Sequence, residues 1–338
     1  RERLRVSVTA YRLQVPEYRL PDCDVRIGRL YHGSVVGTGF ERLGREEGMT
    51  KRFVPIAMAV AAAVTLGAQQ EGSVAQFSSG VQLVEVYATV TDEKGELYTG
   101  LRREDFEVYE NNQLQEVSAF AAGEFPLTVA LGVDRSWSMA GEPLRLAKQA
   151  SQTFLRALKP ADRAMVVAIS SDADVIAPLT MDRLEQSRAI AGLDPWSTTA
   201  LHDGVIAALD RLEPERGRQA LVLFSDGVDR YSTKSSSDVL ERARRSSALV
   251  YPIAVGRTRP PLLAELAVLT GGRSFLLRDI KDLEKTLADI ARELRYQYLL
   301  GYAPGASIKP TSREWRSIRV VVKRSGLRVR ARDGYMTE

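Results

Sequence analysis

The central part of the sequence alternates between short, nearly continuous apolar runs and longer segments whose apolar residues recur every three or four positions. Continuous runs are typical of strands covered on both faces, and the wider spacing is typical of the helices that cover them. The expected strands are residues 127–133, 164–170, 219–225, 248–256 and 274–277. The expected helices are a segment from Pro143 to Leu158, then residues 182–192, 199–212, 236–247, 261–270 and 282–295. This alternation predicts an α/β fold of Rossmann-like type: a doubly wound, mostly parallel sheet with helices on both faces.

The segments on either side of this region have the alternating pattern of antiparallel strands. Residues 81–91 predict one strand, and residues 105–120 predict two more that meet at Asn111 and Asn112, which tolerate the backbone angles of a tight hairpin. Further strands are expected at 296–302, 317–323 and 327–332. We expect the two flanks to pair with each other in a small all-β domain. The predicted organisation is an N-terminal β segment (69–125), the α/β domain (126–295) and a C-terminal β segment (296–338).

The N-terminal residues show the features of a targeting segment. After Met49, two basic residues precede a short apolar stretch, which is followed by small residues that end at Ala68. This is the layout of a secretory signal peptide. Residues 49–68 are therefore expected to be a signal peptide. Residues 1–48 are rich in arginine and have no sustained periodicity. We expect them to be an upstream leader that was included by a start site placed too early, and to be disordered.

This division changes the meaning of the charge. The chain has 47 basic and 43 acidic residues, but residues 1–68 hold 11 of the former and 7 of the latter, which leaves 36 of each for 69–338. The remainder is electrically neutral and gives no support for nucleic-acid binding. The single cysteine, Cys23, lies in the leader, so disulfides are not expected.

Oxygen-bearing side chains follow several of the predicted strands directly. The strand 127–133 leads into Asp134, Ser136 and Ser138, whose alternate spacing can aim three side chains at one point. Thr199 opens a predicted helix, and Asp226 ends another buried strand. Because ligands of open α/β sheets collect at the carboxyl ends of strands, these five residues predict one site. Two carboxylates and three hydroxyls suit a hard cation such as Mg²⁺.

Three stretches of this site carry a family resemblance. DRSWSM, STTALHDG and LVLFSDG resemble the metal-ion-dependent adhesion site of von Willebrand factor type A (VWA) domains, and the order of elements across 126–293 is similar to that domain. The flanks resemble those of exported bacterial VWA-related proteins of the acidobacterial type. One departure is Trp137, which stands between the serines where a small residue is usual.

The resemblance implies roles for these residues. Ser136, Ser138 and Thr199 would bind Mg²⁺ directly, with Mn²⁺ or Ca²⁺ as possible substitutes, and Asp134 and Asp226 would act largely through water. A carboxylate from an Asp or Glu of a protein or peptide partner would complete the coordination. Trp137, Trp196 and His202 are expected to contact that partner.

Several alternatives stay open. A Ser/His/Asp hydrolase would have to use His202, and the serines lack a glycine-flanked nucleophile elbow; Mg²⁺-dependent hydrolysis has no apparent general base. The alternation of Arg328, Arg330 and Arg332 could form a face that binds polyanions or glycans, or simply a solvated strand face. The protein could also be a structural scaffold in which the metal only holds the loops together.

A second ion at Asp172 and Asp174 is less favoured than a polar turn. The function favoured by the sequence is that of an exported adhesion module without enzymatic activity. It would reside in the periplasm, on the cell surface or in the medium, and would contact the membrane only through an uncleaved signal segment.

Overall fold

The computed structural model describes residues 83–123, 125–278, 283–304 and 313–337. The expected leader (1–48) and signal peptide (49–68) lie outside these residues. All described residues belong to one compact unit, Ala75–Glu338. Within the described ranges, no helix combines the length and the apolar character needed to cross a membrane.

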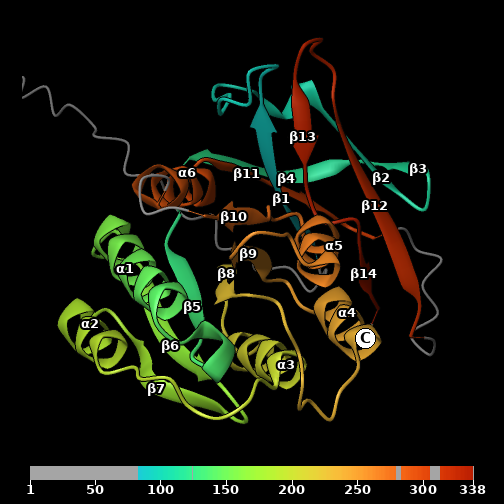
Figure 1. Cartoon of the computed structure of the whole chain (residues 1–338). Coiled ribbons are helices and arrows are strands. Elements are labelled where there is room, and N and C mark those ends of the chain that lie inside the picture. Colours follow the sequence, from blue (N-terminus) through green and yellow to red (C-terminus); the bar gives the residue numbers. More distant parts are fainter. Residues whose placement is uncertain (1–82, 124, 279–282, 305–312, 338) are drawn as a thin grey trace, which may run out of the picture. The chain divides into compact units, whose positions relative to one another are not determined.

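A six-stranded sheet forms the centre of the α/β region, in the order β10-β9-β8-β5-β6-β7 (Figure 1). Its strands are β5 (Leu127–Asp134), β6 (Arg163–Ile169), β7 (Ala173–Thr180), β8 (Arg218–Ser225), β9 (Leu249–Val255) and β10 (Phe275–Leu277). Every residue of β5, β8 and β9 is buried, which explains their continuous apolar runs. All neighbours are parallel except β7, which pairs antiparallel with β6.

The edge strand β7 is not among the predicted elements. Its burial pattern is mixed and it contains Pro178, both of which weaken a strand signal in sequence. Asp174 lies inside this strand, while Asp172 forms the turn before it and accepts a hydrogen bond from the backbone N–H of Ser170 through its carbonyl oxygen at 2.9 Å. The polar turn expected here is thus shorter than the sequence indicated.

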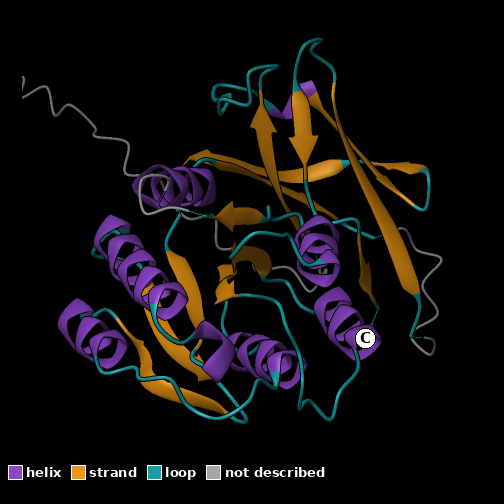
Figure 2. Ribbon diagram, in the orientation of Figure 1, coloured by secondary structure: helices purple, strands orange, loops and turns teal. Residues whose placement is uncertain are grey.

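Helices cover both faces of this sheet, as predicted (Figures 1 and 2). The helices are α1 (Glu142–Ala157), α2 (Arg183–Ala191), α3 (Leu201–Leu212), α4 (Ser236–Arg245), α5 (Pro261–Thr270) and α6 (Leu283–Arg295). Buried residues of α1, α2 and α6 belong to one apolar core, and those of α3, α4 and α5 to a second core on the other face. Two 3-10 turns, η1 (Arg103–Asp105) and η2 (Trp137–Met139), complete the helical elements of the described chain.

The flanking segments form two four-stranded sheets. One has the order β13-β1-β11-β4 and the other the order β14-β12-β2-β3. The strands before the α/β region are β1 (Val84–Thr91), β2 (Phe106–Glu110), β3 (Gln113–Gln115) and β4 (Val117–Gly123). Those after it are β11 (Gln297–Tyr302), β12 (Trp315–Val322), β13 (Arg328–Arg330) and β14 (Gly334–Met336). Strands of both flanks pair antiparallel with each other, as the sequence led us to expect.

The hairpin between β2 and β3 follows from its two asparagines. Asn111 and Asn112 have positive φ angles of 47° and 65°, the backbone geometry of a two-residue hairpin turn. The strand β2 ends at the buried Glu110, which pairs with Arg316 of β12 at 2.5 Å. Glu110 also accepts hydrogen bonds from the hydroxyls of Tyr302 (2.8 Å) and Tyr335 (3.0 Å). This buried polar cluster therefore joins strands of both flanks.

The arginine face considered for residues 327–332 is not present as such. Arg328 is exposed, but Arg330 pairs with the buried Glu293 of α6 and donates to the carbonyl oxygen of Gly271 at 3.1 Å. Arg332 donates to the carbonyl oxygen of Gly334 at 2.7 Å. Burial lowers the pKa of both Arg330 and Arg332. Two of the three guanidinium groups are thus used inside the molecule, which contradicts a polyanion-binding face formed by all three.

Candidate metal site

The predicted site residues lie where the strand order reverses. The chain runs from β5 outward through β6 to β7, and then returns to place β8 on the other side of β5. The carboxyl ends of β5 and β8 flank this switch point, which is where ligands of open α/β sheets bind. Asp134 is the last residue of β5, and Asp226 directly follows β8.

Asp134 is the buried centre of the site. Its side chain is inaccessible to solvent, and both carboxylate oxygens accept hydrogen bonds. Oδ1 accepts from the backbone N–H of Ser136 at 2.9 Å and from its hydroxyl at 2.6 Å. Oδ2 accepts from the hydroxyl of Ser225 at 2.6 Å. The carboxylate is therefore fixed in position, and the hydroxyl proton of Ser136 is directed at it.

The electrostatics at Asp134 favour a nearby positive charge. Burial raises the pKa of Asp134 above the ordinary range of aspartate, and the charge of Asp226 raises it further. The hydrogen bonds from Ser136 and Ser225 lower this pKa and partly offset the effect of burial. Two carboxylates that repel each other in a poorly hydrated place are stabilised in their ionised form by a cation.

The two serines have the spacing of neighbouring metal ligands. The hydroxyl oxygens of Ser136 and Ser138 lie 3.1 Å apart. Adjacent ligands of an octahedral Mg²⁺ ion, each about 2.0–2.1 Å from the metal, are separated by roughly 3 Å. Since the hydroxyl proton of Ser136 is donated to Asp134, lone pairs of this oxygen remain available to a cation.

Thr199 and Asp226 belong to two further loops of the site. Thr199 is buried, and its carbonyl oxygen accepts hydrogen bonds from the backbone N–H groups of Arg230 and Tyr231, both at 2.9 Å. Asp226 is half-buried and accepts a hydrogen bond from the backbone N–H of Val228 at 3.0 Å. Asp226 follows the strand that pairs with β5, and its negative charge raises the pKa of Asp134.

The set of donors consists mainly of hydroxyl groups. Among the described residues, no group of three or more His, Cys, Asp and Glu side chains is arranged to hold a metal ion. A cation at this place would have to use the hydroxyls as well as the two carboxylates. Hard oxygen donors of this kind fit Mg²⁺ and not a soft metal.

The three residues predicted to meet a partner differ in their surroundings. Trp137 and Trp196 are 64% and 57% exposed. The side chain of His202 is only 16% exposed, and its Nδ1 lies 3.0 Å from the carbonyl oxygen of Lys234. The backbone N–H of His202 also donates to Asp229 at 3.2 Å. His202 therefore holds the loop after β8 in place, and its contact with a partner stays a prediction.

Ser225 and Tyr231 are site residues that the sequence does not single out. Ser225 bonds to Asp134 as described, and its hydroxyl oxygen also accepts from the backbone N–H of Gly227 at 2.9 Å. A serine at the end of a buried strand is a usable signal, because a buried hydroxyl requires a partner. Tyr231 lies in an irregular loop, where periodicity gives no information.

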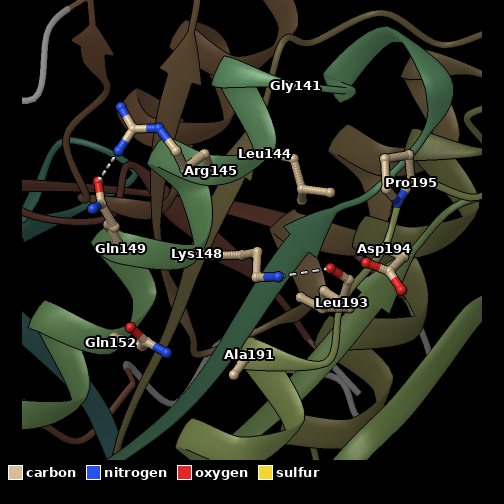
Figure 3. Close-up of a pocket in the computed structure, with 10 residues that line it drawn as sticks. All are labelled: Gly141, Leu144, Arg145, Lys148, Gln149, Gln152, Ala191, Leu193, Asp194 and Pro195. Carbon is tan, nitrogen blue, oxygen red and sulfur yellow. Dashed lines mark hydrogen bonds between the residues drawn. The ribbon is translucent and has the colours of Figure 1, made fainter.

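A groove of about 350 Å³ lies next to the site, between α1 and the loop that follows α2 (Figure 3). It begins at Gly141, shortly after the serine loop, and ends at Pro195, which precedes Trp196. The amine of Lys148 donates to the carbonyl oxygen of Leu193 at 2.8 Å and so ties the loop to α1. The remaining lining residues are Leu144, Arg145, Gln149, Gln152, Ala191 and Asp194.

Residues 129–228 match the family described as the von Willebrand factor type A domain. The chain contains a VWA domain. The matched residues include the ends of β5 and β8 and all five predicted metal-site residues, so the resemblance drawn from DRSWSM, STTALHDG and LVLFSDG is confirmed for the domain.

Other proteins are similar to parts of the chain. Human calcium-activated chloride channel regulator 4 is 27% identical over 160 residues, which is 45% of this chain and 17% of that protein. A von Willebrand factor type A protein from Catenulispora acidiphila has a TM-score of 0.46 and 14% identity, covering 77% of this chain and 74% of that one. The vWF domain of the type V pili tip protein Mfa5 from Porphyromonas gingivalis has a TM-score of 0.43 and 13% identity, covering 51% and 95%.

Proposed function

We propose that the protein is a metal-dependent binding module whose VWA domain captures a carboxylate of a protein or peptide partner through a Mg²⁺ ion. The observation that carries this proposal is the geometry around Asp134. A buried carboxylate holds the hydroxyl of Ser136 in place, and that oxygen lies 3.1 Å from the hydroxyl of Ser138.

In this proposal the residues have different roles. Ser136, Ser138 and Thr199 supply oxygen ligands to the ion. Asp134 and Asp226 balance its charge, acting largely through hydrogen bonds and water. Because neutral hydroxyls are its direct ligands, the ion would keep enough positive charge to attract a carboxylate from another molecule. Mn²⁺ or Ca²⁺ could replace Mg²⁺ in the same set of oxygen donors.

A binding role fits the site better than catalysis. His202 is tied to the loop after β8, and its Nδ1 lies 3.7 Å from Asp229, so it is not placed as a base for Ser136. A serine hydrolase would also need a nucleophile, a base and an oxyanion site at one point. We further propose that the protein is exported, because residues 49–68 have the pattern of a signal peptide.

The proposal is tested with a fluorescent peptide, acetyl-Ser-Ser-Asp-Ser-Ser-amide, and the full chain. Anisotropy should rise in millimolar Mg²⁺ and remain at its free value in EDTA. A peptide with Asn in place of Asp should not bind. The Ser138→Ala variant should lose binding, whereas Ser151→Ala, a buried serine of α1 away from the site, should retain it. Equal binding in Mg²⁺ and in EDTA would contradict the proposal.

A further inference from the structure

We infer that three exposed aromatic side chains, Trp137, Trp196 and Tyr231, form a binding rim that selects partners whose acidic residue is flanked by large apolar side chains. The inference rests on the proposed function, because the carboxylate is assigned to the cation. It adds the chemistry of the residues on either side of that carboxylate.

Among the described aromatic side chains that are exposed, these three are each more than half exposed, whereas Tyr296 is only 38% exposed. The chain has three tryptophans, and the two on the site loops are 64% and 57% exposed, while Tyr231 is 64% exposed. Val228, on the same loop as Tyr231, is 36% exposed. Aromatic side chains left in water around one point are typical of a surface that another molecule covers.

Each aromatic residue is fixed by its own backbone to a neighbouring loop. The N–H of Trp137 donates to the carbonyl oxygen of Ser197 at 3.0 Å, and the N–H of Trp196 donates to that of Arg135 at 2.7 Å. The N–H of Tyr231 donates to the carbonyl oxygen of Thr199 at 2.9 Å. The three loops are thus bonded to one another at the strand ends that hold the candidate metal ligands.

This arrangement reduces the entropic cost of binding. The backbones of the rim are ordered before a partner arrives, and an aromatic side chain has few rotatable bonds to immobilise. Tryptophan and tyrosine are among the residues that most often provide the strong contacts of an interface. In this chain the central contact would be the charged one, between cation and carboxylate.

The groove in Figure 3 continues the rim on one side. Pro195 lines it beside Trp196, whereas Leu144 and Leu193 are buried and the other long side chains of the lining are charged or polar. Its volume of about 350 Å³ is at the lower end of the range for ligand pockets, which is enough for one or two side chains of a peptide. An extended peptide is therefore the partner that fits: its acidic residue at the site, an apolar neighbour over Trp196, and the chain beyond that neighbour along this groove.

The experiment compares two labelled peptides on the full chain in Mg²⁺. One is acetyl-Ser-Ser-Asp-Ser-Ser-amide, and the other is acetyl-Leu-Leu-Asp-Leu-Phe-amide. The apolar peptide should bind about tenfold or more tightly than the serine peptide. In the double variant Trp137→Ala/Trp196→Ala, the two peptides should bind with equal affinity, while the calorimetric titration with Mg²⁺ stays unchanged. Met181→Ala, an exposed apolar residue before α2, serves as the matched control and should leave the preference intact.

The outcomes separate the two proposals. If neither peptide binds in a Mg²⁺-dependent way, the proposed function fails. If both bind in Mg²⁺ but with equal affinity, or if the double variant keeps the preference, the aromatic rim is refuted and the proposed function stands. Binding of the apolar peptide in EDTA, or of the protein to phosphatidylcholine vesicles through the same tryptophans, would also overturn the inference, because the rim would then act without the carboxylate.

Discussion

Replacing Ser225 by alanine should destabilise the metal-free protein, although the change removes a single oxygen atom. The hydroxyl of Ser225 donates to Oδ2 of Asp134 at 2.6 Å and accepts from the backbone N–H of Gly227 at 2.9 Å. Both Ser225 and Asp134 are inaccessible to solvent. Water therefore cannot easily replace the lost donor, and one oxygen of a buried carboxylate would have no partner.

The size of the effect follows from these two bonds. A hydrogen bond to a charged group contributes about 1.5–3 kcal/mol to stability, and one between neutral groups contributes about 0.5–1.5 kcal/mol. Gly227 is only half-buried and its N–H can bond to water, so the loss of this bond counts little. We expect Ser225→Ala to lower the free energy of unfolding by about 1.5–3 kcal/mol.

Urea unfolding at neutral pH in EDTA, followed by circular dichroism, measures this change. Ser151→Ala is a matched control: its buried hydroxyl donates to the carbonyl oxygen of Ala147 within α1 at 2.8 Å, and alanine favours the helix. This control should change stability by less than about 1 kcal/mol. If Ser225→Ala unfolds within about 0.5 kcal/mol of the parent, the carboxylate of Asp134 does not depend on this donor and the role assigned to Ser225 is wrong.

Three further predictions concern stability. In EDTA, Asp134→Asn should become more stable relative to the parent as pH rises above the ordinary aspartate pKa of 3.8. The reason is that the raised pKa of Asp134 makes its ionisation in the folded state costly. A stability difference that stays constant across pH would contradict this. Gly204→Ala should destabilise by about 1–3 kcal/mol, since the added Cβ would lie 2.6 Å from Cγ2 of Ile169; a higher melting temperature would refute the close packing. Arg316→Met should lower the free energy of unfolding by about 3–5 kcal/mol, because the buried Glu110 loses its counter-charge. The control Arg319→Met, on the exposed side of the same strand, should lower it by less than about 1 kcal/mol. Equal losses would contradict the role of the buried pair.

The central sheet could be predicted from the sequence because its strands are buried on both faces. Continuous apolar runs such as those of β5, β8 and β9 are typical of strands that lie between two layers of helices. The edge strand β7 escaped prediction because one of its sides is exposed and its sequence contains Pro178. An edge strand needs neither a continuous apolar run nor a full set of backbone hydrogen bonds.

The candidate site was predictable in part for a related reason. Asp134, Ser136 and Asp226 stand directly at strand ends, and parallel strands bring their carboxyl ends to one edge. Ser225 was not predictable as a partner of Asp134, because the contact depends on β8 lying next to β5. The pairing of Arg330 with Glu293 likewise depends on how the C-terminal flank packs against α6, and the local pattern of alternating arginines gave no sign of it.

A calorimetric titration of Mg²⁺ into the full chain, beside the Asp134→Asn variant, is the decisive test of the proposed metal site. Asparagine keeps the size of the side chain but removes the negative charge, so folding is preserved while the cation loses its buried counter-charge. Asp194→Asn, an exposed aspartate on the loop after α2, is the matched control. We predict that the parent and the control each bind one ion and that Asp134→Asn binds none. Equal binding by Asp134→Asn and the parent would contradict a metal site at the end of β5.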